Sequence, residues 1–149
     1  MKITLDEAVR NAVEQHGVAT FPNECCGFLY GNDWEVRGIA EARPVTNSKE
    51  GDQRRRFSIS PKDYMAAERY ALEQGTTLLG VYHSHPNHPA IPSEHDLRQA
   101  LPFFSYIIVS IQEGKPDHLR SWRLDDAGAF AEEQIVPVPV PRPENISQT

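Results

Sequence analysis

The stretch Gly80–Ala100, GVYHSHPNHPAIPSEHDLRQA, decides how the rest of the chain is interpreted. It contains four of the six histidines of the chain, together with three prolines and Asp96. An apolar segment, Leu78–Tyr82, leads into it and predicts a buried strand, and the stretch ends in a predicted helix. Histidine and aspartate are poor residues for strand and helix interiors, and proline interrupts both elements. We therefore predict that this stretch is a metal site, which the rest of the chain supports.

The candidate metal ligands are His83, His85 and Asp96. The two histidines are two residues apart at the end of a strand, so their side chains point to the same side. Asp96 lies in the first turn of the predicted helix, and three prolines stiffen the intervening loop. Two imidazoles and one carboxylate suit zinc, and three protein ligands leave a fourth position for water. This pattern is typical of a catalytic site rather than a closed structural one.

Each half of this pattern also has a simpler explanation. Histidines in an HxH pattern can satisfy hydrogen bonds in a core. Ser93 and Asp96 fit a helix-capping motif, in which an acidic residue is favoured near the positive end of the helix. The combination of HxHP with SxxD at this spacing is far more specific than either part.

Residues 83–86, HSHP, followed by residues 93–96, SEHD, resemble the JAMM signature of the MPN-domain metalloproteases. The family also has an upstream glutamate, and Glu24 in PNECCGFLYG matches its position. The resemblance runs from the first helix to about Ile135 and is greatest to the short prokaryotic members. It implies the α/β MPN fold shared with cytidine deaminases, with a curved mixed β-sheet flanked by helices.

The resemblance also implies a mechanism. His83, His85 and Asp96 would bind Zn²⁺, Glu24 would take a proton from a water molecule and pass it to the leaving amine, and Ser93 would stabilise the oxyanion. The expected activity is zinc-dependent hydrolysis of a peptide or isopeptide bond at the C-terminal Gly-Gly of a ubiquitin-like or sulfur-carrier protein. One such role is to release a newly made cysteine from the C-terminus of its carrier.

Two other classes of protein were considered against this interpretation. A cytidine deaminase needs HxE followed by PCxxC, and neither motif occurs in the sequence. A non-catalytic MPN-type scaffold that binds a protein partner remains an alternative. Scaffold members usually lack the complete set of ligands and the glutamate, which this chain has.

The composition predicts one soluble domain. The chain has 149 residues, of which 39% are hydrophobic and 24% charged, as in folded globular proteins. A net charge of −6 argues against nucleic acid as the main partner. No apolar run is long enough to cross a bilayer, and the N-terminal residues lack a signal region, so we expect no membrane association and a cytoplasmic location. The adjacent Cys25 and Cys26 exclude a disulfide framework and a zinc finger.

The JAMM/MPN domain is predicted to cover residues 1–136, followed by a flexible proline-rich tail, residues 137–149. The first helix is predicted at Thr4–His16, because Thr4 and Glu7 form a capping box and Gly17 supplies a stop. The other predicted helices are Pro61–Gln74 and Ser93–Leu101. The predicted strands are Cys25–Tyr30, Trp34–Ala42, Phe57–Ile59, Leu78–Tyr82, Tyr106–Ile111, Leu119–Leu124 and Ala129–Val136.

Several residues near the site are predicted to have structural roles. The segment Arg43–Arg56 is expected to be an exposed, mobile loop with solvated arginines rather than a binding patch. Cys26 is expected to pack in the core, and Ser84 to support the backbone because it points away from the two histidines. His88 is expected at the rim of the cleft, and His95 on the helix surface.

Overall fold

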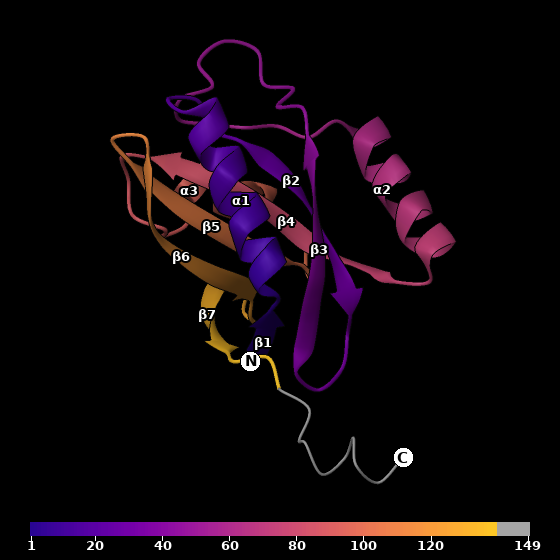
Figure 1. Cartoon of the computed structure of the whole chain (residues 1–149). Coiled ribbons are helices and arrows are strands. Elements are labelled where there is room, and N and C mark those ends of the chain that lie inside the picture. The colour runs from indigo at the N-terminus through magenta and orange to yellow at the C-terminus, as the bar shows by residue number, and fades with distance from the viewer. Residues whose placement is uncertain (140–149) are drawn as a thin grey trace, which may run out of the picture.

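The computed structural model describes residues 1–139, so the predicted tail lies outside the described residues from position 140 onward. The elements of this part of the chain are β1 (Lys2–Leu5), α1 (Glu7–Thr20), β2 (Cys26–Asn32), β3 (Arg37–Val45), α2 (Pro61–Gln74), β4 (Thr77–Pro86), α3 (Glu94–Gln99), β5 (Ser105–Gln112), β6 (Lys115–Leu124) and β7 (Phe130–Val136). Figure 1 shows α1 lying across the strands, with α2 to one side beside β3. No helix within residues 1–139 combines the length and the apolar character that crossing a bilayer requires.

The strands form one mixed sheet that closes into a barrel in the order β1-β3-β2-β4-β5-β6-β7. β1 pairs parallel with both β3 and β7, and β4 pairs parallel with β5, whereas the remaining pairs are antiparallel. The predicted mixed sheet with helices is therefore confirmed. Its curvature extends to closure because the short N-terminal strand β1 joins β3 to β7.

The N-terminal prediction is wrong. Thr4 does not cap a helix but lies in β1, where it pairs with Gly38 and Val136. The helix begins after Asp6 and continues to Thr20. Gly17 is buried within it, and a Cβ atom there would lie 2.9 Å from the side chain of Ile111. This glycine therefore permits close packing of α1 on β5 instead of ending the helix.

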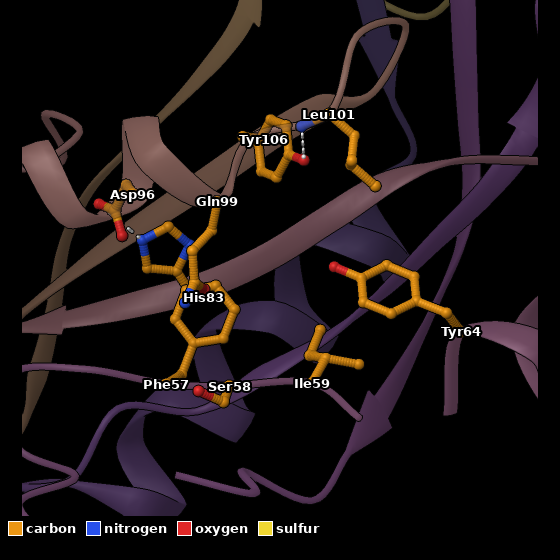
Figure 2. Close-up of a pocket in the computed structure, with 9 residues that line it drawn as sticks. All are labelled: Phe57, Ser58, Ile59, Tyr64, His83, Asp96, Gln99, Leu101 and Tyr106. Carbon is orange, nitrogen blue, oxygen red and sulfur yellow. Dashed lines mark hydrogen bonds and ion pairs between the residues drawn. The ribbon is translucent and has the colours of Figure 1, made fainter. Parts of the chain in front are cut away.

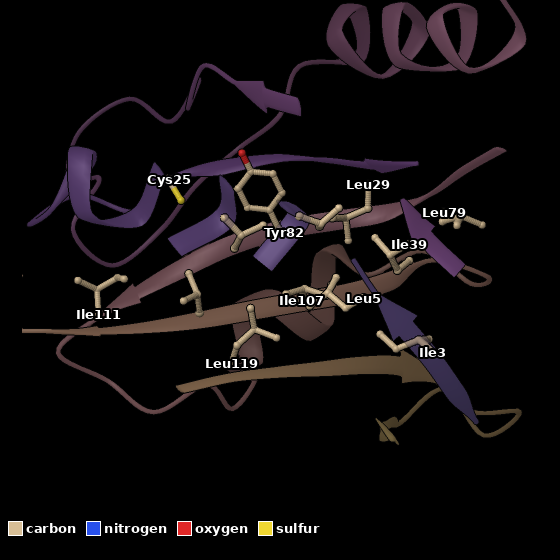
Figure 3. Close-up of a cluster of buried hydrophobic side chains, with 13 residues drawn as sticks. Ile3, Leu5, Cys25, Leu29, Ile39, Leu79, Tyr82, Ile107, Ile111 and Leu119 are labelled. Atoms are coloured by element: carbon tan, nitrogen blue, oxygen red, sulfur yellow. The ribbon is translucent and has the colours of Figure 1, made fainter. Parts of the chain in front are cut away.

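Two clusters of buried side chains hold the helices to the sheet. The first lies between α1 and the strands and includes side chains from β1 to β6 (Figure 3). The second contains Ala67 and Ala71 of α2, packed with aromatic residues that include Phe28 and Tyr106. The predicted boundaries of α2 are correct: Ser60 Oγ accepts a hydrogen bond from the Asp63 N–H, and Gly75 ends the helix with φ 69°.

The connection between β3 and α2 differs from the prediction. β3 begins later than expected and extends to Val45, and no strand forms at residues 57–59. The remaining loop has internal hydrogen bonds. Asn47 Oδ1 accepts from the N–H groups of Lys49 and Ser58, and Gln53 Nε2 donates to the carbonyl groups of Asn47 and Lys49. These bonds give the loop a defined path towards the predicted site.

Candidate metal centre

His83, His85 and Asp96 converge at the carboxyl end of β4. The distance between the two Nε2 atoms is 3.2 Å, and Asp96 Oδ2 lies 3.3 Å from His83 Nε2 and 3.2 Å from His85 Nε2. Ligand atoms of a tetrahedral zinc site, each about 2.0–2.1 Å from the metal, lie about 3.3 Å from one another. The triangle of donor atoms therefore has the size and the chemistry that fit a zinc-sized cation.

His83 is fully buried and stacks on Phe57, with 4.6 Å between ring centroids. Burial lowers the pKa of His83, and this effect outweighs the opposing influence of Asp96. Its Nδ1 atom has no hydrogen-bond partner within residues 1–139. The neutral imidazole that burial favours is also the form that binds a metal.

His85 is oriented by the loop that follows β4. Its Nδ1 atom lies 2.8 Å from the carbonyl oxygen of Pro89. Because a carbonyl only accepts, Nδ1 must donate its hydrogen, which leaves the lone pair of Nε2 facing the triangle. This hydrogen bond selects the tautomer that a metal ligand requires.

Asp96 takes part in both arrangements that the sequence suggested: it caps α3, and it lies with the two histidines in the candidate metal centre. Its N–H donates to Ser93 Oγ at 3.0 Å, and its Oδ2 accepts from the N–H of Ser93 at 2.9 Å, which completes a capping box for α3. The same oxygen faces both histidines. Burial raises the pKa of Asp96, but the nearby His83, followed by His85 and the hydrogen bond from the Ser93 N–H, holds it far below its usual range.

Glu24 lies two residues before the start of β2 and reaches the site through strand register, because Cys26 pairs with His83. Its backbone N–H donates to Gln53 O at 2.7 Å, and its carbonyl oxygen accepts from Asn47 Nδ2 at 3.3 Å. The side chain is 5% exposed, and Oε1 has no hydrogen-bond partner in the described part of the chain. Burial, and secondly the charge of Asp96, raise the pKa of Glu24 to about 9.

Two cavities meet at the triangle. One has a volume of about 310 Å³, and His83 and Asp96 line it together with Phe57, Tyr64 and Tyr106 (Figure 2). The other has a volume of about 440 Å³. It is lined by Glu24, Arg55, His85, His88, Pro89, Ile91 and Ser93. The site thus has a largely aromatic side and a side rich in ionisable groups.

The family described as Prokaryotic homologs of the JAB domain matches residues 6–125. The chain belongs to this family. Over 90 residues this JAB-domain chain is 32% identical to a protein named Desampylase from Haloferax volcanii. The matched region covers 60% of the chain and 63% of that protein. It is 31% identical over 105 residues to Tail tip assembly protein K from Escherichia phage N15, with 70% of the chain and 39% of that protein covered. The chain therefore spans less than two thirds of the length of these two relatives.

Further similarities concern a protease and solved structures. The JAB-domain chain is 49% identical over 52 residues to a Probable TtuB-protein conjugate cleaving protease from Thermus thermophilus, with 35% of each chain covered. A solution structure of a Salinibacter ruber protein is 40% identical, with TM-score 0.70 and 97% and 94% of the chains covered. A JAB1/MPN domain protein from Archaeoglobus fulgidus has TM-score 0.55 at 21% identity, with 91% and 99% covered. This last similarity confirms the predicted MPN fold, whereas the relation to cytidine deaminases stays a prediction.

The residues that hold the loop after β4 in this JAB-domain protein were missed by sequence reasoning. The N–H of Ala90 donates to His118 Nε2 at 2.9 Å, and Trp122 Nε1 donates to Ala90 O at 3.0 Å. In addition, Ser110 Oγ donates to His88 O at 2.6 Å. His118 and Trp122 lie on β6 at an even spacing, which indicates a shared strand face but not the loop that they contact.

The structural roles predicted for neighbouring residues are mostly confirmed. Ser84 Oγ accepts a hydrogen bond from the N–H of Cys25 at 2.8 Å and so supports the β2 backbone. Cys26 is a free, buried thiol. His88 is exposed where it lines the cavity, but His95 is partly buried rather than on the helix surface. Arg54, Arg55 and Arg56 are exposed, as predicted for a solvated loop, and Arg55 also lines the cavity that contains Glu24.

Proposed function

We propose that this protein is a zinc-dependent hydrolase that cleaves a peptide or isopeptide bond at the C-terminal Gly-Gly of a ubiquitin-like or sulfur-carrier protein. The triangle of His83, His85 and Asp96 beside the buried Glu24 carries the proposal. Relatives named Desampylase and Probable TtuB-protein conjugate cleaving protease support a protein conjugate as the substrate.

The metal would be held by His83 Nε2, His85 Nε2 and Asp96 Oδ2. Zinc, when bound there, would polarise the scissile carbonyl group and make water more acidic. The hydrogen bond of His85 to Pro89 O and the bond of Asp96 to Ser93 N–H fix two of the three ligands in advance. Such preorganisation reduces the entropy lost when a cation binds.

Glu24 is proposed as the group that moves the proton. Its carboxylate would accept a proton from the attacking water as the water oxygen bonds to the carbonyl carbon. The same proton would pass to the nitrogen when the C–N bond breaks, so the products are a carboxylic acid and an amine. In the metal-free protein burial raises the pKa of Glu24 to about 9, so Glu24 would act as a base only when a bound cation lowers this pKa towards the working pH.

Ser93 is proposed to stabilise the oxyanion. Its Oγ atom accepts the N–H of Asp96, so the hydroxyl hydrogen remains free to donate into the cavity that Ser93 shares with Glu24. A donor directed at the developing negative charge contributes more in the transition state than in the ground state.

The test uses carrier proteins extended beyond their C-terminal Gly-Gly, with products followed by mass spectrometry and zinc measured by elemental analysis. We expect about one zinc per chain and cleavage after Gly-Gly. Glu24→Gln should retain zinc and stop cleavage, His85→Ala should lose zinc, and the exposed Glu94→Gln should change neither. Absence of zinc after purification without chelators and after titration, or native cleavage by Glu24→Gln, would overturn the proposal.

A second candidate function is that of a protein-binding scaffold. The similarity to Tail tip assembly protein K favours this candidate, because that name describes assembly. The complete triangle and Glu24 favour the hydrolase instead. A zinc-loaded protein that binds a carrier fusion stably but leaves it intact would decide for the scaffold.

A further inference from the structure

The cavity lined by Glu24 and His85, called the charged cavity below, contains two residues that the proposed chemistry does not use. Arg55 and His88 line it beside Glu24, His85 and Ser93. Its volume of about 440 Å³ lies in the range of pockets that hold small ligands. Pro89 and Ile91 add an apolar wall. The cavity can therefore hold a small group that combines an apolar part with an anion.

Arg55 is an exposed residue that lines this cavity. The neighbouring Arg54 pairs with Asp52 at 3.3 Å, whereas Arg55 forms no ion pair within residues 1–139. Asn47 Nδ2 donates both to Glu24 O and to the carbonyl oxygen of Arg56, the residue next to Arg55. The backbone beside Arg55 is thus tied to the backbone of the residue proposed to move the proton. A free guanidinium is a strong site for a carboxylate.

His88 supports the same side of the cavity. Its carbonyl oxygen accepts from Ser110 Oγ at 2.6 Å, and its N–H donates to His85 O at 3.4 Å, so the backbone is held. No hydrogen bond to its ring is found in the described part of the chain. The ring is therefore available to donate a hydrogen bond to a ligand.

The proposed mechanism indicates which part of a substrate enters this cavity. Glu24 must lie next to the leaving nitrogen in order to return the proton. Glu24 lines two cavities, and only the one with Arg55 and His88 also contains the candidate ligand His85, so we place the leaving amine there. The acyl part then extends towards the aromatic cavity at His83 (Figure 2). In a C-terminal amino acid the α-carboxylate is only two bonds from this nitrogen. In a lysine isopeptide the leaving ε-amine has no carboxylate near it.

We infer that Arg55, assisted by His88, binds a carboxylate on the leaving amine, so that the protein favours removal of a C-terminal amino acid over cleavage of a lysine isopeptide. This inference rests on the proposed hydrolase function and adds the leaving-group specificity. The carboxylate could be the free α-carboxylate or the side chain of an acidic residue. The α-carboxylate is the nearer of the two to the scissile bond.

The test compares four carrier substrates that differ after Gly-Gly: alanine with a free carboxylate, alanine amide, aspartate amide, and a lysine isopeptide. The zinc-loaded protein should cleave the free acid with a kcat/KM at least about tenfold above the amide and the isopeptide. Aspartate amide should behave as alanine amide if the α-carboxylate is recognised, and as the free acid if the cavity accepts any nearby carboxylate.

Arg55→Gln should lower kcat/KM for the free acid by about 10- to 100-fold, mainly through KM, and leave the amide unchanged. Arg55→Lys should restore part of the loss, and His88→Gln should cost about threefold. The matched control Arg54→Gln should behave as the native protein. Equal cleavage of acid and amide, or an equal loss for both in Arg55→Gln, would overturn the inference.

A binding measurement separates this inference from the hydrolase proposal. Calorimetric titration of Glu24→Gln with the acid and amide fusions should give at least about tenfold tighter binding of the acid, and Arg55→Gln in the same background should abolish the difference. If the native protein cleaves none of the fusions, the hydrolase proposal fails, and this titration still decides whether Arg55 binds a carboxylate. Equal affinity for both fusions would reject the subsite.

Discussion

Buried charged groups lie near both ends of β4, and their surroundings differ. Near the amino end, Arg37 is 2% exposed, and its guanidinium donates to Leu79 O, Phe103 O and Ser105 Oγ and pairs with Asp33. At the carboxyl end, Glu24 is similarly buried, but one carboxylate oxygen has no partner within residues 1–139. A buried charge with a full set of partners stabilises one fold, whereas a buried acid without them is available for a ligand or a proton.

The partners of Arg37 extend into a larger network. Glu133 is buried beside it, accepts a hydrogen bond from Ser121 Oγ at 2.8 Å and pairs with Arg123. The Arg37 guanidinium also lies 4.4 Å from the centre of the Phe103 ring. Burial lowers the pKa of Arg37, and nearby Arg123 lowers it further, but Asp33 and Glu133 oppose these effects. This network joins β3, β6 and β7 at a distance from the candidate metal centre.

The largest expected effect comes from breaking this network. Arg37→Met should lower the free energy of unfolding by about 3 kcal/mol, because it leaves the buried acceptors Leu79 O and Ser105 Oγ without their donor. Urea unfolding would measure the change, with the exposed Arg69→Met as the control. Zinc bound per folded molecule should stay the same. A loss below about 1 kcal/mol would remove the distinction between the two ends of β4.

The difference between the candidate metal centre and the Arg37 network also explains which of the two could be predicted from the sequence. The convergence of His83 with His85 follows from strand alternation, and Asp96 follows from the capping pattern at the start of α3. These are local rules that depend on neighbours in sequence. Arg37 offered no such signal, because its partners Leu79 and Ser105 lie on other strands.

The errors have the same origin. Thr4 has the sequence pattern of a helix cap, but pairing of β1 with β3 and β7 outweighs that local preference. Arg55 is exposed as predicted, but nothing near it in sequence shows that its loop passes Glu24. His118 and Trp122 were missed because their contact with Ala90 crosses from β6 to the loop after β4. Long-range pairing, not local propensity, determines these positions.

The next largest effect concerns the stability of the metal-free protein, because the buried Glu24 should weaken the fold. Burial, followed by the charge of Asp96, raises the pKa of Glu24 from 4.5 to about 9, so the folded, metal-free protein holds this proton more tightly than the unfolded chain. Stability from this group is therefore present below pH 4.5 and lost as pH rises towards 9. Glu24→Gln should stabilise the metal-free protein by about 2 kcal/mol at pH 8.

Urea unfolding in the presence of a chelator at pH 5 and pH 8 would measure this effect. The gain should be smaller at pH 5, because this pH lies close to the ordinary pKa of 4.5 and the unfolded chain still binds about a quarter of a proton there. Glu94→Gln, at an exposed position in α3, is the control and should show no such pH dependence. Destabilisation by Glu24→Gln at pH 8 would mean that the carboxylate has a structural partner.

A smaller effect concerns the support of the candidate metal centre. Trp122→Phe removes the donor to Ala90 O, beside Pro89, whose carbonyl oxygen accepts from His85. It should weaken zinc binding by up to about tenfold, the lower end of the effect of removing a direct partner of a metal ligand. Competition with a chelator of known affinity would measure it. Trp34→Phe, at a position that is 69% exposed, is the matched control. Unchanged affinity in Trp122→Phe would show that Pro89 O alone orients His85.

The smallest effect tests whether burial, rather than pairing itself, makes the Arg37 network important. Arg120 Nε and Glu132 Oε2 lie 3.0 Å apart, as close as Arg37 Nε and Asp33 Oδ1, but the Arg120 side chain is 41% exposed whereas that of Arg37 is 2% exposed. A double-mutant cycle of Arg120→Gln and Glu132→Gln should give a coupling energy below about 0.5 kcal/mol, because water and salt screen exposed pairs. Coupling above about 1 kcal/mol that persists in high salt would contradict this interpretation. In that case the coupling energy of an ion pair would not depend on burial. The lack of a hydrogen-bond partner for the buried Glu24 Oε1 would then be weaker evidence for a function.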